Sequence, residues 1–126
     1  MLIDSQVVLW ILDDNPRLGT VARQLLTSAP RVHVSAATVW QLTVKTILGK
    51  LSVPENLPEI LVEQGLELMP ITAEHAAGIR AFPELRQHDP FDRLITAQAS
   101  IESMDLLTAD RALLALGRSF VVDATL

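Results

Sequence analysis

Four aspartates have the residue type and the placing needed to hold a divalent cation: Asp4, Asp89, Asp92 and Asp110. Asp4 and Asp110 each follow a short apolar run, whereas Asp89 and Asp92 lie on either side of Pro90 at the start of a helical pattern. Crowded carboxylates raise one another's pKa and destabilise a fold, and Mg²⁺ or Mn²⁺, which prefers oxygen ligands, relieves that repulsion. The chain has no cysteine and no His-x-x-x-His pair, so a zinc site has little support.

Taken singly, each aspartate also has a purely structural explanation. Asp4 could cap the helix that follows it, and Asp89 with Asp92 has the spacing of a capping box. Asp110 lies in the first turn of a helical pattern, where the macrodipole favours an anion. The metal hypothesis therefore depends on whether the fold brings the four side chains together.

Short apolar runs alternate with longer helical patterns along the whole chain. We expect strands at 2–3, 32–34, 66–71, 106–107 and 120–122. We expect helices at 5–12, 17–28, 35–49, 54–65 and 73–81, and two more that begin at 89 and at 108. Three of these helices have a favoured N-cap residue, namely Ser35, Thr72 and Asp89. This alternation predicts a three-layer α/β/α fold with a mostly parallel central sheet, in a single domain over 1–126. Ligands of such sheets bind beyond the carboxyl ends of the strands, which is where Asp4 and Asp110 are expected.

The composition limits the classes of function. Apolar residues make up 49 % of 126 residues, enough for one sizeable core, and the absence of cysteine fits a reducing compartment. No apolar run approaches the roughly 20 residues of a membrane span, and the N-terminus lacks the pattern of a signal peptide, so a soluble cytoplasmic protein is predicted. The net charge of −5 argues against a broad basic face for nucleic acid, unless cations or a few Lys and Arg compensate locally.

Four stretches of the sequence share a pattern with one family. They are Leu2-Ile3-Asp4-Ser5, residues 34–42 with 45–51, residues 88–99, and Leu107-Thr108-Ala109-Asp110-Arg111. Taken together and in this order, they resemble the PIN-domain ribonucleases of the VapC toxin type, from residue 2 to the last expected strand. The Asp-Pro-Phe-Asp-Arg run at 89–93 is the most specific part of the match.

The resemblance implies that Asp4, Asp92 and Asp110 are acidic residues that bind Mg²⁺ or Mn²⁺ and support catalysis, with Asp89 as an accessory. The implied reaction is hydrolysis of an RNA phosphodiester by a water that the metal activates. The resemblance also implies a homodimer held by a cognate antitoxin, whose C-terminal segment blocks the site.

Neighbours of these aspartates have supporting roles in the same comparison. Ser5 and Thr108 are expected to orient carboxylates through hydrogen bonds. Lys45, Arg93 and Arg111 either contact RNA phosphates or balance the charge of the acidic cluster.

Position 41 departs from the family pattern, which has Glu where this chain has Gln. Ser35, Thr38, Gln41 and Lys45 share one helical face, so Gln41 is still expected to face the site as a neutral member of the catalytic set. Three interpretations stay open: a natural variant of an active enzyme, a weakened enzyme, or a change made to express a toxic protein.

The three histidines and the two tryptophans are interpreted as structural residues. His88 precedes a helix and is interpreted as a surface or capping residue, while His33 and His75 have no partner that the sequence identifies. Trp10 and Trp40 are predicted to pack in the core, with a partner groove as the less favoured role of Trp10.

Three other functions compete with a ribonuclease. The strongest is a PIN-like scaffold that binds RNA or an antitoxin without cutting, because Gln41 removes a charge. An aspartyl-phosphate phosphatase would want an acid at position 6, which is Gln, and a receiver domain would want an acidic pair before its first helix. A nuclease that prefers DNA flaps would need extra helical elements.

Overall fold

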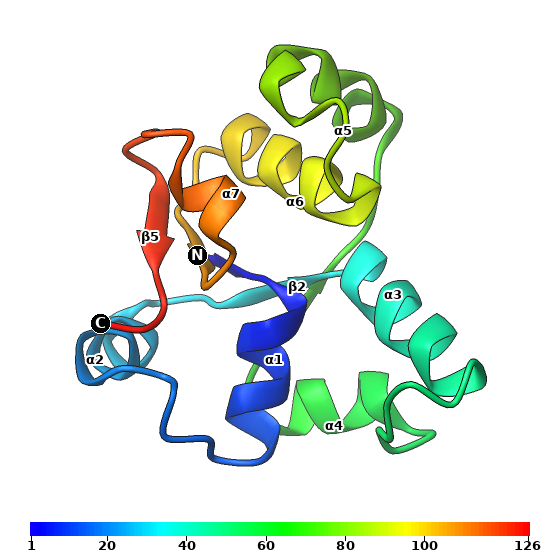
Figure 1. Ribbon diagram of the computed structural model, residues 1–126. Coiled ribbons are helices and arrows are strands. Elements are labelled where there is room, and N and C mark those ends of the chain that lie inside the picture. The colour runs from blue at the N-terminus through cyan, green and yellow to red at the C-terminus, as the bar shows by residue number, and fades with distance from the viewer.

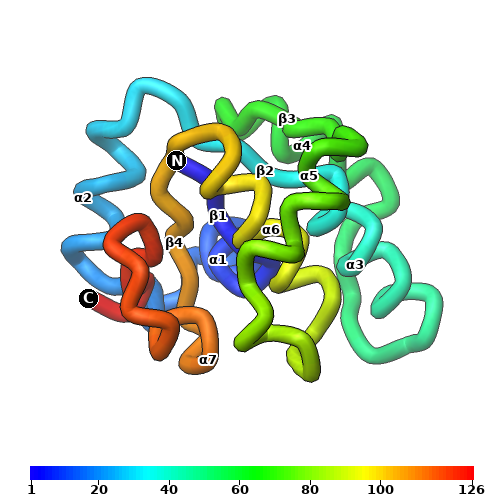
Figure 2. The backbone as a smooth tube through the Cα atoms, turned by 90° about the horizontal axis from the view of Figure 1, so that it is seen from above, coloured from blue at the N-terminus to red at the C-terminus, as the bar shows by residue number.

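Five parallel strands form one sheet at the centre of the computed structural model, which describes all residues from 1 to 126. The strands are β1 (Leu2–Ile3), β2 (His33–Ser35), β3 (Glu67–Met69), β4 (Leu106–Thr108) and β5 (Val121–Asp123), in the spatial order β3-β2-β1-β4-β5. Figure 2 shows β1 between β2 and β4. Every neighbouring pair is parallel, so the predicted α/β fold is confirmed, and the sheet is parallel throughout.

The helices lie on both sides of this sheet, with α1, α2 and α4 on one side and α5, α6 and α7 on the other (Figure 1). Their bounds are α1 (Ser5–Leu12), α2 (Thr20–Ser28), α3 (Ala36–Ile47), α4 (Leu57–Glu63), α5 (Ala73–Gly78), α6 (Pro90–Ile101) and α7 (Arg111–Leu114). Two short 3₁₀ helices, η1 (Ile79–Ala81) and η2 (Pro83–Leu85), lead from α5 toward α6. The predicted three layers are therefore present.

Neighbouring residues of the central strands pack into different cores. Leu2 and Leu106 belong to the hydrophobic cluster under α6 and α7, whereas Ile3 and Leu107 belong to the cluster under α1, α2 and α4. All four side chains are fully buried. Because successive side chains of a strand point to opposite faces, two apolar residues in a row are what a sheet covered on both sides requires.

The C-terminal residues pack against the start of α2 (Figure 1). The backbone N–H of Gly19 donates to the Ala124 carbonyl at 2.9 Å, and that of Val21 donates to the Leu126 carbonyl at 2.7 Å. A Cβ at position 19 would lie 2.2 Å from the carbonyl carbon of Leu126, so only glycine fits this close approach.

Several predicted helix bounds were too wide. α2 begins at Thr20 rather than at residue 17, because Gly19 is its extended N-cap. Thr108 ends β4, and α7 begins only after Asp110, its N-cap. The helix predicted over 54–65 spans Leu57–Glu63, and the one predicted over 73–81 ends at Gly78 and continues as η1. No helix has the length and apolar character needed to span a membrane.

One prediction for an aromatic side chain was wrong, and two histidines have partners that the sequence did not identify. Trp10 is buried as predicted, but Trp40 is 60 % exposed and packs edge-on against Phe91 with ring centroids 5.1 Å apart. His33 and His75 do have partners, because their Nε2 atoms lie 3.2 Å from Glu67 and 2.8 Å from Glu102. These contacts join residues far apart in sequence, which no local pattern indicates.

Candidate metal centre

Asp4 lies at the carboxyl end of the central strand β1, where it caps α1. Its Oδ1 accepts a hydrogen bond from the Val7 backbone N–H at 2.9 Å, and its Oδ2 accepts one from the Thr108 hydroxyl. The side chain is only 3 % exposed. Since Ile3 pairs with Leu107 across β1 and β4, the residues that follow both strands meet at the same edge of the sheet.

Thr108 links Asp4 to Asp110. Its hydroxyl donates to the Asp4 carboxylate and accepts from the Asp110 backbone N–H at 3.0 Å. Asp110 in turn caps α7, with its Oδ1 accepting from Ala112 at 2.9 Å and Leu113 at 3.1 Å. Thr108 thus has the contacts predicted for a hydroxyl that orients carboxylates, whereas Ser5, half-buried at the start of α1, makes no such hydrogen bond.

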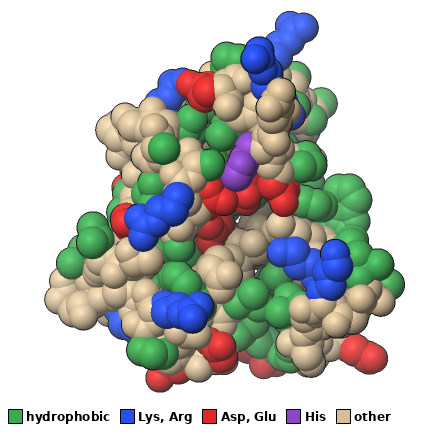
Figure 3. Space-filling view, in the orientation of Figure 1, with side chains coloured by type: hydrophobic (Ala, Val, Ile, Leu, Met, Phe, Trp, Pro, Cys, Tyr) green, Lys and Arg blue, Asp and Glu red, His purple; other side chains and the backbone are tan.

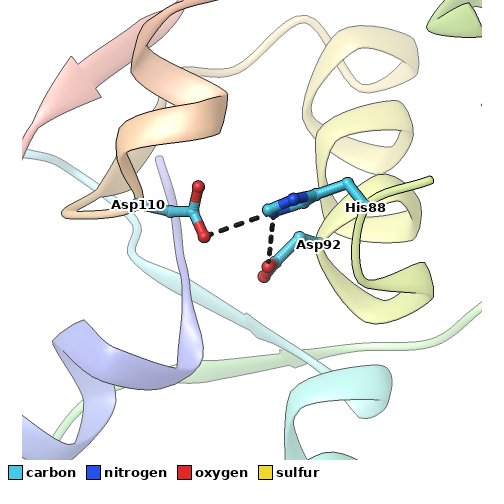
Figure 4. A group of neighbouring side chains, drawn as sticks. All are labelled: His88, Asp92 and Asp110. Atoms are coloured by element: carbon cyan, nitrogen blue, oxygen red, sulfur yellow. Dashed lines mark hydrogen bonds and ion pairs between the residues drawn. The ribbon is translucent and has the colours of Figure 1, made fainter. Parts of the chain in front are cut away.

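Asp89 and Asp92 occupy the first turn of α6 but face different partners. Asp89 is the predicted N-cap, and its Oδ1 accepts from the Phe91 backbone N–H at 2.8 Å. The reciprocal half of the expected capping box does not form. The Asp92 carboxylate instead lies beside His88 and faces Asp110, the N-cap of α7 (Figure 4).

His88 stands between Asp92 and Asp110, a position that the sequence interpretation missed. Its Nε2 lies 3.2 Å from Asp92 Oδ2 and 3.3 Å from Asp110 Oδ2 (Figure 4). The ligand atoms of these three residues all lie within 4.8 Å of one another, close enough to hold one metal ion. The four-residue spacing between His88 and Asp92 was the available signal, but the approach of α7 was not visible in it.

The carboxylates of this cluster carry charge that the protein does not balance. Burial, followed by the charges of Asp110, Asp89 and Asp4, raises the pKa of Asp92 to about 7, with the charge of His88 opposing the rise. The pKa of Asp4 is also raised, first by burial and then by the charge of Asp110, against the hydrogen bonds from Thr108 and Val7. None of the four pairs with a Lys or Arg. A set of crowded oxygen donors with uncompensated charge fits a hard divalent cation.

The other predicted site residues lie on α3 and α6. Gln41 is buried on α3, and the contact between its neighbour Trp40 and Phe91 brings α3 beside the first turn of α6. Lys45 is exposed on the same helix and forms no ion pair. Arg93 donates to the Arg86 carbonyl at 3.3 Å rather than to a carboxylate.

The surface shows how these charges are distributed. Acidic side chains gather in a central hollow, with a histidine above them and Lys and Arg side chains on either side (Figure 3). One of the predicted basic residues, Arg111, is exposed and contacts Asp123 at 3.4 Å. The acidic hollow with basic flanks is the local compensation that a nucleic-acid enzyme of net negative charge needs.

Comparison with known proteins agrees with this architecture. The family model described as PIN domain matches residues 1–118. Among solved structures, the chain is similar to VapBC2 from Rickettsia felis bound to a promoter DNA fragment, at 16 % identity over 97 % of this chain and 95 % of that one, with a TM-score of 0.67. It is also similar to FitAcB from Neisseria gonorrhoeae, at 22 % identity over 97 % and 94 % of the two chains, with a TM-score of 0.58.

A third similar structure is a toxin–antitoxin complex from Klebsiella pneumoniae, at 14 % identity over 86 % of this chain and 85 % of that one, with a TM-score of 0.61. No curated protein sequence matches the chain. The PIN model nevertheless covers nearly the whole length, and the parallel sheet with aspartates at its carboxyl edge agrees with it. The chain therefore belongs to the PIN domain family.

Proposed function

We propose that this protein is a metal-dependent endoribonuclease and the toxin of a VapC-type toxin–antitoxin pair. The observation that carries the proposal is the convergence of Asp4, Asp92 and Asp110, where burial and, after it, mutual repulsion raise the pKa of Asp92 to about 7. Family membership and the likeness to toxin–antitoxin structures support the same function. A cytoplasmic location, where RNA is present, is part of the proposal.

In this proposal each aspartate has a defined task. Asp92 and Asp110 hold the cation with oxygens that no backbone N–H occupies, and Asp4 completes the set from the buried side, held by Thr108. Asp89, which caps α6, adds negative potential. When bound, Mg²⁺ or Mn²⁺ offsets the charge of a phosphodiester and makes water a better nucleophile.

RNA would reach the acidic hollow along its basic flanks. Lys45 is exposed and has no carboxylate partner, so its ammonium group is available to a phosphate. Arg111 is exposed beside the N-cap of α7 and gives up only a long contact with Asp123 on binding RNA. Arg93 is half-buried against the Arg86 carbonyl, so its contribution would be to hold the loop before α6.

A second candidate function is a PIN scaffold that binds RNA or an antitoxin without cutting. The observation in its favour is Gln41, a buried neutral amide on α3 where the family pattern has a carboxylate. This alternative keeps the fold and the partners and changes only the chemistry, so activity measurements separate the two.

We further propose two protein partners. An antitoxin segment would lie in the cleft of about 560 Å³ between α1 and residues 51–54, which Trp10 helps to line.

A second copy of the chain would pack on the outer face of α3, because Trp40, Ile47 and Leu48 are large apolar side chains left exposed there. Light scattering of the wild type and of Ile47→Glu tests the dimer, which the charge should dissociate; a monomeric wild type would contradict it.

The function is tested by incubating purified protein with total RNA and Mg²⁺ or Mn²⁺. Four forms are compared: wild type, Gln41→Glu, Asp92→Asn, and the matched control Asp13→Asn, an exposed aspartate at the end of α1. Cleavage by the wild type and the control that disappears with chelator and with Asp92→Asn supports the enzyme. Cleavage only by Gln41→Glu supports a PIN scaffold that has lost its catalytic activity. If no folded, metal-bound form cleaves RNA, the proposed ribonuclease activity is contradicted.

A further inference from the structure

We propose that His88 is a nitrogen ligand of the metal centre, and that it makes the centre prefer Mn²⁺ or a heavier first-row transition ion to Mg²⁺. The inference rests on the proposed metal-dependent function and concerns which atoms hold the ion. Mg²⁺ binds almost only oxygen donors, whereas imidazole is a ligand that transition metals favour.

The spacing of the side chains fits ligands of one ion. The imidazole Nε2 lies 3.2 Å from Asp92 Oδ2 and 3.3 Å from Asp110 Oδ2. Two ligand atoms at right angles, each about 2.1 Å from an ion, are about 3 Å apart. The observed separations are thus close to those of adjacent positions around a single metal.

The surroundings hold His88 in this position. Its backbone N–H donates to the Leu85 carbonyl at 2.9 Å, at the end of η2, and the next residue is the N-cap of α6. These contacts order the backbone on both sides of His88, so little backbone entropy is lost when the imidazole binds an ion. The side chains of His88 and Asp110 are both 28 % exposed, so an ion has access to them.

Hydrogen bonding alone accounts poorly for the arrangement. Both carboxylate oxygens approach the same nitrogen, and one N–H cannot make a short, straight hydrogen bond to two acceptors. A cation placed among the three groups satisfies all of them at once. With a neutral Gln at position 41, the centre also has one carboxylate fewer than the family pattern. The imidazole nitrogen of His88 supplies a donor atom that partly replaces this carboxylate.

The two roles of His88 predict opposite effects of its removal. If His88 is a ligand, His88→Ala weakens Mn²⁺ binding and lowers the preference for Mn²⁺ over Mg²⁺. If His88 only donates to the carboxylates, it must leave before an ion can bind, and His88→Ala then tightens binding of both ions. The sign of the change therefore separates a ligand from a charge partner.

The experiment uses the full chain, freed of metal by chelation and titrated with Mn²⁺ while the signal of free Mn²⁺ is followed by EPR. Pulsed EPR of bound Mn²⁺ then detects the magnetic coupling of a directly bound imidazole nitrogen. Competition with Mg²⁺ gives the selectivity. His33→Ala is the matched control, because His33 also has a carboxylate partner but lies at the amino end of β2.

We expect nitrogen coupling in the wild type and in His33→Ala, and its loss in His88→Ala together with about tenfold weaker Mn²⁺ binding. Bound Mn²⁺ without nitrogen coupling, or equal or tighter binding by folded His88→Ala, overturns the inference and leaves the proposed function standing. A wild type that binds no Mn²⁺ overturns both.

Discussion

Asp92→Asn should stabilise the metal-free protein, although it removes a residue of the proposed centre. In the folded chain the pKa of Asp92 is about 7, whereas its ordinary value is 3.8. Between these two values the unfolded state releases its proton and the folded state keeps it, so stability falls as the pH rises. Asn is similar in shape and carries no charge, so it avoids this loss.

The size of the effect follows from the shift. A rise from 3.8 to about 7 corresponds to roughly 4 kcal/mol, at about 1.4 kcal/mol per pKa unit. Asp92 keeps 15 % of its side chain in water and shares the repulsion with Asp110, so we expect roughly 2 to 4 kcal/mol at pH 8. For a chain of this length that corresponds to a rise in Tm of roughly 5 to 15 °C.

The assay is urea unfolding in EDTA at intervals from pH 4 to pH 8, with Asp13→Asn as control. The advantage of Asp92→Asn over the wild type should be near zero at pH 4, grow up to pH 7 and then level off. Saturating Mn²⁺ should remove it, because the ion compensates the charge. An advantage that is constant with pH, or none at pH 8, would refute the electrostatic argument.

Three more perturbations test the same architecture. Thr108→Val removes the hydroxyl that joins Asp4 to Asp110, and should lower the free energy of unfolding in urea by about 1 to 3 kcal/mol and weaken Mn²⁺ binding. The control is Thr43→Val, because the Thr43 hydroxyl contacts only the α3 backbone. Equal effects of the two substitutions would contradict the link between Asp4 and Asp110. Gln41→Glu restores a carboxylate and should raise metal-dependent RNA cleavage, an idea defeated by an unchanged rate in folded, metal-loaded protein. Gly19→Ala places a Cβ against the Leu126 backbone and should cost roughly 1 to 3 kcal/mol, so an unchanged unfolding midpoint would show that the C-terminal residues move aside freely.

Local chemistry explains why so much of the fold could be predicted. Asp4, Ser35, Thr72 and Asp89 all accept the hydrogen bonds of helix N-caps, as expected from residue types that act within four positions of themselves. The alternation of apolar strands with amphipathic helices likewise gave a parallel α/β sheet, because burial on both faces leaves few other arrangements.

The errors concern contacts between distant elements. Trp40 was predicted in the core, but which side of α3 faces solvent depends on how α3 meets α6. His88 was interpreted as a surface or capping residue, and its place between two carboxylates depends on the approach of α7 to α6. Sequence periodicity fixes a helix's own faces and says little about the partner that covers each one.

The position of β1 in the middle of the sheet has a consequence for synthesis on the ribosome. Asp4 is made before the hydroxyl that orients it, which comes from Thr108, 104 positions later. In a nascent chain, or in one that ends early, the aspartates are therefore not brought together. The centre assembles only after β4 has paired with β1 and α7 has followed it, so translation products that end before these elements lack the arrangement.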